Sequence, residues 1–423
     1  MLNLKIIQQS INPQALKICQ ILQQANFQAF IVGGCVRDLL LNHIPKDWDI
    51  TTDATPQQVM ELFPRNHPTG LQHGTVTVIM GEGVENHFEI TTFRTEGIYL
   101  DGRRPEEVFF VKNIEQDLAR RDLTINAIAY DPIKNQLIDP FNGQLDLQNG
   151  VIRAVGNPID RFNEDGLRII RAARFAARFN YEIEEKTEEA MFEAVEILHK
   201  ISKERIKDEL CKILESKCPN LGLRILYSCH ALDIMCPYLL ENLPYRHILT
   251  QDLCRGDLET KIAFLYRHCT STSKIIQELF GLKFSVKEIK KVEILHNLAG
   301  KFLYWRMKWS VDAYKNFMAD LKETAGEDWE YTLEQLIKLM EAEGIPISVS
   351  LDSFKDVIVF SKKEMNINGN DLISMGIKPS PQIGVILNKC YREILKNPEH
   401  NTKEFLLDFC LKGEIRSSMS CMK

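Results

Sequence analysis

The chain has 423 residues, of which 44% are hydrophobic and 26% are charged, a composition too apolar for a disordered protein. Its apolar runs fall far short of the roughly 18 residues needed to cross a bilayer, so we expect no membrane partner. The net charge of −6 argues against a protein that coats nucleic acids in general. Eleven cysteines without a C-x-x-C pair indicate neither a disulfide framework nor a cysteine zinc site, so we expect a reduced, cytoplasmic compartment.

The first 145 residues alternate between short predicted helices and strands. Residues 1–30 predict an amphipathic helix that leads into an apolar strand, Phe27–Val32. Further β-rich runs lie at Thr75–Met80, His87–Thr92, Val108–Val111 and Ala127–Asp131, between helical stretches at 36–41, 56–63 and 115–120. This alternation predicts an α+β sheet domain.

After Pro140 the pattern becomes helical and stays so to the end of the chain. Helical periodicity is clear at 162–179, 184–200, 202–216 and 219–230, and proline and glycine residues divide the remainder into helix-sized pieces. We therefore expect three regions: a sheet domain over 1–145, a helical segment over 146–215 and a longer helical array over 216–423.

A glycine pair follows the first predicted strand. Gly33 and Gly34 let the backbone approach a bulky ligand and present N–H groups at the start of a helix, an arrangement suited to phosphate. Arg37, one turn into that helix, supplies a cation for the same oxygens. Most Gly-Gly turns bind nothing, so this feature needs the residues that follow it.

Two acids with one residue between them follow the glycine pair. In an extended segment Asp47 and Asp49 project from the same face, and their mutual repulsion is relieved by a hard divalent cation, with phosphate partners favouring Mg²⁺. Glu89, on a later predicted strand, is a third acid for the same catalytic set. The alternative is that the aspartates are turn residues beside Pro45 and Thr51.

The segment GGCVRDLLLNHIPKDWDITTDATP resembles polymerase-β-like nucleotidyltransferases, and more narrowly the bacterial class II tRNA nucleotidyltransferases (CCA-adding enzymes) and their poly(A) polymerase relatives. The resemblance continues through TGLQHGTVTV, FEITTFRTEG, ARRDLTINAIA, IDPFNG, RFNEDGLRIIRAARFAARF and INGNDLISMGIKPSPQIGVILN. It implies a catalytic head at 1–145, a base-selecting neck at 146–215, and a body and tail at 216–423 that bind tRNA.

The same resemblance implies that Arg121 and Asp122 contact the incoming nucleotide and its sugar. The chemistry agrees, because a guanidinium binds triphosphate oxygens and a carboxylate accepts hydrogen bonds from ribose hydroxyls. The alternative is a solvated, charged helix end.

The charged residues of RFNEDGLRIIRAAR predict one side of a single helix, since Asp165, Arg168 and Arg171 recur every three residues and Arg174 extends the row. Cytosine and adenine each present an amino donor beside an acceptor, which suits a carboxylate next to a guanidinium. We assign base selection to Asp165 and Arg168, matching the family's E-D-x-x-R motif, and place Arg171 and Arg174 against the nucleotide. The alternative is an exposed i, i+3 ion pair.

The predicted function is template-independent addition of C, C and A to the 3′ end of tRNA from CTP and ATP, with release of pyrophosphate. The helical half is expected to grip the tRNA acceptor arm through phosphates and shape. Residues Thr95–Pro105 resemble the family's flexible loop, which argues against a CC-only enzyme. An A-only enzyme, a poly(A) polymerase and a catalytically silent RNA-binding protein remain as alternatives.

Overall fold

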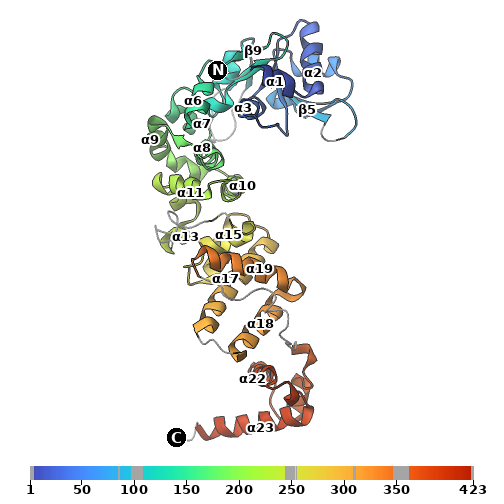
Figure 1. Cartoon of the computed structure of the whole chain (residues 1–423), viewed down its shortest axis with the longest axis vertical. Coiled ribbons are helices and arrows are strands. Elements are labelled where there is room, and N and C mark those ends of the chain that lie inside the picture. The colour runs from blue at the N-terminus through green and yellow to red at the C-terminus, as the bar shows by residue number, and fades with distance from the viewer. Residues whose placement is uncertain are drawn as a thin grey trace. The chain divides into compact units, whose positions relative to one another are not determined.

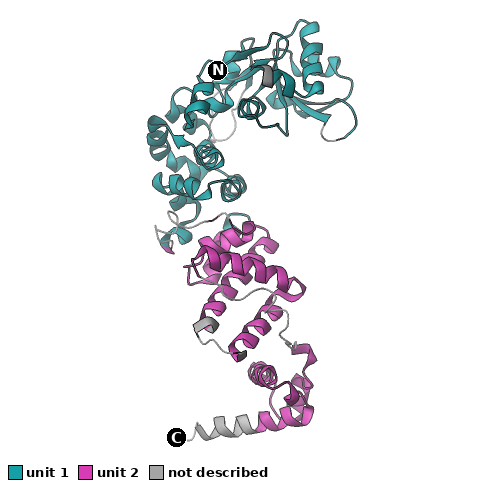
Figure 2. Cartoon of the chain, in the orientation of Figure 1, with its two compact units in different colours: residues 1–241, 281–283 teal, residues 242–280, 284–423 magenta. Residues whose placement is uncertain are grey.

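The computed structural model forms two compact units, residues 1–241 with 281–283 and residues 242–280 with 284–423 (Figure 2). The described residues are 4–83, 86–96, 108–242, 253, 255–307, 311–345 and 362–420. The loop expected beside the site, Thr95–Pro105, lies almost entirely outside them. No helix of the described residues combines the length and the apolar character that a bilayer crossing requires.

The first unit begins with a mixed sheet, of which Figure 1 labels β5 and β9. Its strand order is β3-β4-β5-β2-β1-β8-β9. Its strands are β1 (Ala29–Val32), β2 (Asp49–Thr52), β3 (Asn66–Gly70), β4 (Thr75–Ile79), β5 (His87–Thr92), β8 (Ala129–Asp131) and β9 (Gln136–Ile138). Neighbouring strands are antiparallel except β2 and β5, which run parallel with Asp49 opposite Glu89. A separate hairpin pairs β6 (Arg94–Glu96) with β7 (Val108–Phe110).

One face of the sheet packs into a hydrophobic core. Ile31, Ile50 and Ile90, on three adjacent strands, are at most 1% exposed, because alternate residues of a strand point to the same side. The helices of this domain are α1 (Leu4–Ser10), α2 (Pro13–Gln24), α3 (Gly34–Leu40), α4 (Pro56–Leu62), α5 (Ile114–Ala119) and α6 (Gly143–Asn149). Asn12 caps α2 by accepting from the Gln14 amide at 2.7 Å, so the long helix expected over 1–30 is two helices.

The remainder of the first unit is helical apart from a small pairing of β10 (Val151–Ile152) with β11 (Glu182–Ile183). Its helices are α7 (Pro158–Glu164), α8 (Leu167–Phe179), α9 (Glu185–Glu193), α10 (Lys203–Leu214), α11 (Pro219–Ser228), α12 (Ala231–Met235) and α13 (Pro237–Asn242). Helix α11 packs closely on α8 at Gly222, where a Cβ would lie 3.0 Å from the Cβ of Ala177. The glycine therefore sets the spacing of these two helices.

The second unit is also helical. It contains α15 (Leu258–Leu265), α16 (Thr272–Gly281), α17 (Val286–Met307), α18 (Val311–Ala325), α19 (Trp329–Ala342), α21 (Gly369–Ser374), α22 (Gln382–Lys396) and α23 (Lys403–Ser420). Leu372, Ile394 and Leu406 form the core of the last three helices. Arg392 joins α22 to α18 through an ion pair with Asp320 at 2.8 Å. A sheet domain followed by a helical array is thus confirmed.

Candidate active site

The predicted catalytic acids lie at one edge of the two parallel strands. Asp49 is the first residue of β2 and is half-buried, Asp47 precedes the strand and is exposed, and Glu89 faces Asp49 from β5 and is also exposed. Burial raises the pKa of Asp49, Arg121 opposes that shift, and the negative charges of Glu89 and Asp47 add to it. Three acids of one sign therefore share this edge.

The donor set at this edge fits a hard divalent cation. Within the described part of the chain no three His, Cys, Asp or Glu side chains form a complete metal cage. Mg²⁺-type sites commonly use only one or two carboxylates and take their remaining oxygens from substrate phosphates and water. The repulsion that raises the pKa of Asp49 is also what a bound cation would remove.

Gly33 is required by its neighbour Arg121 as well as by its own backbone. Its φ is +80°, and a Cβ at this position would lie 2.7 Å from Nη1 of Arg121. The Gly33 N–H donates to the carbonyl of Ile128 at 3.0 Å, and α3 begins at Gly34. Gly33 thus allows the Arg121 guanidinium to lie against the backbone between β1 and α3.

Arg37 occupies a different environment from the one expected of a phosphate ligand. The residue is 3% exposed, and its guanidinium donates to Asp38 at 2.7 Å and to the side chain of Asn126. The same group lies 5.2 and 5.1 Å from the ring centres of Phe175 and Phe179 on α8. Its hydrogen bonds and ring contacts tie α3 to α8.

Asp122 is held by α8. Its carboxylate accepts from Nε of Arg171 at 2.8 Å and from the Asn126 amide at 3.1 Å. Burial alone would raise the pKa of Asp122, but the Arg171 charge and these hydrogen bonds outweigh it and hold the pKa well below its ordinary value. Asp122 is therefore a fixed anion that links the segment after α5 to α8.

The prediction that Asp165 belongs to one continuous helix with Arg168 is wrong. Helix α7 ends at Glu164, Asp165 has extended backbone angles (φ −143°, ψ 104°), and α8 begins at Leu167. Gly166 lies in the break, and its ideal Cβ would clash with the Ile197 side chain at 2.5 Å. The break turns the Asp165 carboxylate toward the start of α8, where it accepts from the Leu167 N–H at 3.1 Å.

Asp165 and Arg168 are paired with other residues. Both oxygens of Asp165 accept from Arg205 on α10, at 3.2 and 2.6 Å. Arg168 forms an ion pair with Glu164 and donates to the carbonyls of Arg161 and Arg120, at 3.0 and 3.1 Å. Asp165 is therefore held by α10, and Arg168 is held by α7 and the segment after α5.

Two partners of this cluster were not predicted from the sequence. Arg205 holds Asp165, and the buried Glu209 pairs with Arg174 at 2.6 Å. The two residues are four apart on α10 and so lie on one helix face. This i, i+4 spacing in KERIKDEL is a visible signal, but it does not say which charges the face will meet.

Three family models match consecutive parts of the chain. The "Poly A polymerase head domain" matches residues 29–153, the "Probable RNA and SrmB- binding site of polymerase A" matches 180–243, and a model of a second tRNA nucleotidyltransferase domain matches 257–410. The CCA-adding enzyme of Lactobacillus delbrueckii subsp. bulgaricus is 36% identical over 413 residues, 97% of this chain and 99% of the relative. The chain belongs to the CCA-adding enzyme family.

Further relatives agree with this membership. The CCA-adding enzyme of Streptococcus mutans is 34% identical, covering 94% of this chain and 96% of that protein. The crystal structure of the Bacillus stearothermophilus CCA-adding enzyme in complex with CTP aligns with a TM-score of 0.65 at 27% identity, over 97% of this chain and all of that one. The resemblance stated from the motifs is confirmed, and the chain is a nucleotidyltransferase.

Proposed function

We propose that this chain adds C, C and A to the 3′ end of tRNA from CTP and ATP without a nucleic-acid template. The carboxylates at the sheet edge and the Asp165 and Arg168 cluster carry this proposal, because one compact unit contains a site for phosphoryl chemistry and a set of fixed charges for reading a base. Membership of the CCA-adding enzyme family supports it.

We assign Asp47 and Asp49 as the ligands of Mg²⁺, whose oxygen preference matches theirs. When bound there, the cation would lower the pKa of the primer 3′-hydroxyl and would shield charge on the α-phosphate. Glu89, opposite Asp49, holds that hydroxyl on the side of the sheet away from β1. Asp49 then lies between the groups that bind the nucleotide and the groups that bind the primer.

Arg121, Gly33 and Gly34 seat the triphosphate beside β1, where the Arg121 guanidinium already lies against the backbone. We assign Arg37 to the support of this seat, because its hydrogen bonds are made to Asp38 and Asn126. Asp122 lies beside the seat for the nucleotide sugar, with its carboxylate oriented by Arg171.

Base selection is assigned to Asp165 and Arg168. A carboxylate has about four acceptor positions, and Asp165 uses three of them for Leu167 and Arg205. The fourth accepts the amino group shared by cytosine and adenine, while Arg168 donates to the adjacent ring nitrogen. Uracil and guanine present the opposite order, so a carbonyl oxygen would face the Asp165 carboxylate and an N–H would face the Arg168 guanidinium. Arg174, fixed by Glu209, completes the cationic side of α8.

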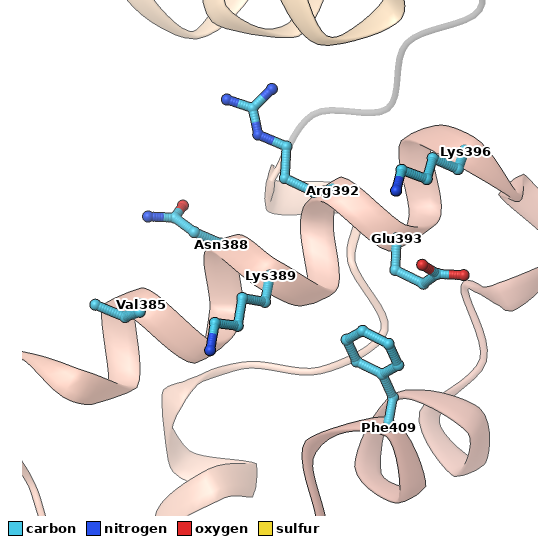
Figure 3. A pocket seen from close by; sticks show the side chains of 7 residues that line it. All are labelled: Val385, Asn388, Lys389, Arg392, Glu393, Lys396 and Phe409. Carbon is cyan, nitrogen blue, oxygen red and sulfur yellow. The ribbon is translucent and has the colours of Figure 1, made fainter. Parts of the chain in front are cut away.

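We assign tRNA binding to residues 216–423 and keep 1–145 and 146–215 as the catalytic and base-selecting regions. The second unit contains a pocket of about 410 Å³ between α22 and Phe409 of α23 (Figure 3). Lys389 and Lys396 line it from two successive turns of α22, and both ammonium groups can bind phosphates of an RNA backbone. The acceptor arm then binds through phosphates and shape, so affinity falls steeply with salt. The scattered cysteines favour the cytoplasm as the place of action.

The test uses purified full-length protein, Mg²⁺ and tRNA that ends at the discriminator base. Labelled CTP alone should add two nucleotides, and CTP with ATP should add three. Repeated addition of A to a generic RNA would identify a poly(A) polymerase, and addition only to tRNA ending in CC would identify an A-only enzyme. No extension by a folded sample would contradict the proposal.

A further inference from the structure

A row of polar side chains crosses the sheet from the candidate metal site. Strand register places Asp49 opposite Glu89, Glu89 opposite Thr77 and Thr77 opposite His67. Residues directly opposite on neighbouring strands share a face of the sheet. The four side chains therefore lie in one line over β2, β5, β4 and β3, on the face opposite the Ile50 and Ile90 core.

The outer end of this row is open to solvent. Glu89 and His67 are exposed, whereas Thr77 is 9% exposed and is covered by the exposed Thr69. The hydroxyls of Thr69 and Thr77 lie 2.8 Å apart. The β3–β4 ladder shifts between His67 and Gly70, and this irregularity accompanies the approach of Thr69 to Thr77. The row thus ends in a fixed hydroxyl next to an imidazole.

The length of the row suits more than one nucleotide. Three steps between strands, each about 4.8 Å, separate His67 from Asp49 by about 14 Å. The rise per stacked nucleotide in one strand is about 3.4 Å, and an unstacked nucleotide spans more. The distance therefore extends beyond the reacting nucleotide to the sugar-phosphate backbone that precedes it.

The order of strands decides which substrate lies here. The groups assigned to the triphosphate, Gly33 and Arg121, lie on the β1 side of Asp49. In phosphoryl transfer the attacking and leaving oxygens are roughly in line, so the nucleophile approaches from the side opposite the pyrophosphate. The strands on that side are β5, β4 and β3, which carry the polar row.

We propose that this row binds the 3′ end of the RNA primer, with His67 contacting the last internucleotide phosphate and Thr69 contacting the penultimate 2′-hydroxyl. This inference rests on the proposed function and adds a primer subsite to it. The Thr69 hydroxyl, oriented by Thr77, both donates to and accepts from a ribose hydroxyl, and the imidazole N–H donates to a phosphate oxygen. Thr77 is a positioning residue.

The test compares His67→Ala and Thr69→Val with wild type in steady-state addition of C to tRNA lacking its CCA end. Both variants should raise the apparent KM for tRNA by about tenfold and leave the KM for CTP unchanged. Thr69→Ser, which keeps the hydroxyl, should behave as wild type. His199→Ala is the matched control, because the His199 side chain is 62% exposed on the 3₁₀ helix Val195–Lys200, outside the sheet.

Two modified primers assign each contact. A methylphosphonate at the last internucleotide linkage should weaken binding by wild type but not weaken His67→Ala further. A 2′-deoxyribose at the penultimate position should likewise weaken binding by wild type but not weaken binding by Thr69→Val further. Equal losses in wild type and variant, or an unchanged KM for tRNA, would overturn the inference. A wild-type sample that extends no tRNA would instead contradict the proposed function.

Discussion

The acids at the sheet edge and the acids beside α8 have opposite electrostatic surroundings. Among the described residues, Asp47, Asp49 and Glu89 form no ion pair, and burial together with like charges raises the pKa of Asp49. Asp122 and Asp165 are each bound by an arginine, and the pKa of Asp122 is lowered. Arg121 offsets only part of the shift at Asp49, so the first group still favours a bound cation, whereas each acid of the second group already has an arginine partner.

This difference in surroundings suggests that the two groups of acids serve different steps, the first the transfer reaction and the second the choice of base. Carboxylates that form no ion pair keep their lone pairs for a metal ion and the reacting oxygens. Carboxylates clamped by guanidinium groups are held in one orientation, and a group that must distinguish an amino group from a carbonyl needs that fixed direction. Changes at the sheet edge should therefore stop the reaction, whereas changes around α8 should alter stability or base choice.

The largest effect is expected at the sheet edge. Asp49→Asn keeps the size of the side chain but removes a negative charge from the proposed metal site, which should lower incorporation of both CTP and ATP by about 10³-fold or more. Binding of tRNA, measured by filter retention, should change less than about threefold. An active Asp49→Asn variant would show that the metal is held elsewhere.

The next effect is on stability and its pH dependence. Asp122→Asn should lower the free energy of unfolding at neutral pH by about 2–3 kcal/mol, because Arg171 loses its buried partner. The pKa of Asp122 is lowered in the fold, so its stabilisation is complete above the ordinary carboxyl pKa, about 3.9, and is lost as pH falls through the lower folded-state value.

Urea unfolding between pH 7 and pH 2 measures this dependence. The stability gap between wild type and Asp122→Asn should narrow as pH falls below about 4. A gap that stays constant across this range would contradict the assignment of the ion pair.

A smaller effect, on selectivity, is expected at Arg205. Arg205→Ala removes the two hydrogen bonds that orient Asp165 and should reduce discrimination of CTP over UTP by about 10- to 100-fold. Arg205→Lys, which keeps the charge but not the two-pronged geometry, should fall between Ala and wild type. Misincorporation measured with each nucleotide alone tests this, and an equal loss of rate for all four would contradict it.

The smallest effect is expected at the solvent end of α8. Arg178 is 44% exposed at its side chain and lies 3.3 Å from Asp38. Exposed pairs of this kind contribute at most about 1 kcal/mol. Arg178→Ala should therefore shift the urea midpoint slightly and leave both rate and base choice unchanged. A loss comparable to that of Asp122→Asn would show that the α3–α8 contact depends on this exposed end.

Local sequence patterns predicted much of the fold. The predicted runs at Thr75–Met80 and His87–Thr92 are β4 and β5, because their apolar and polar residues alternate as a half-buried strand requires. The short strands β3 and β9 were not predicted, since NHPTG and QLI carry little periodicity and are strands only through pairing with β4 and β8. Asp165, with extended backbone angles, interrupts a helical pattern that periodicity alone extends over 162–179.

The sequence indicated which residues belong to the candidate site but not which partners those residues contact. Spacing and the family resemblance singled out Asp165, Arg168 and Asp122, and they remain predictions of function. Their partners Arg205 and Arg171 depend on how α10 and α8 pack, which involves residues 40 and 49 positions apart in sequence. No local pattern encodes contacts over such separations.

Single-turnover incorporation of CTP, ATP, UTP and GTP by wild type, Asp49→Asn and Arg205→Ala tests the separation of chemistry from selection most directly. Asp49→Asn should lower all four rates by the same large factor, and Arg205→Ala should raise the share of UTP and GTP relative to CTP and ATP. A change of base preference in Asp49→Asn, or a uniform loss in Arg205→Ala, would contradict the account.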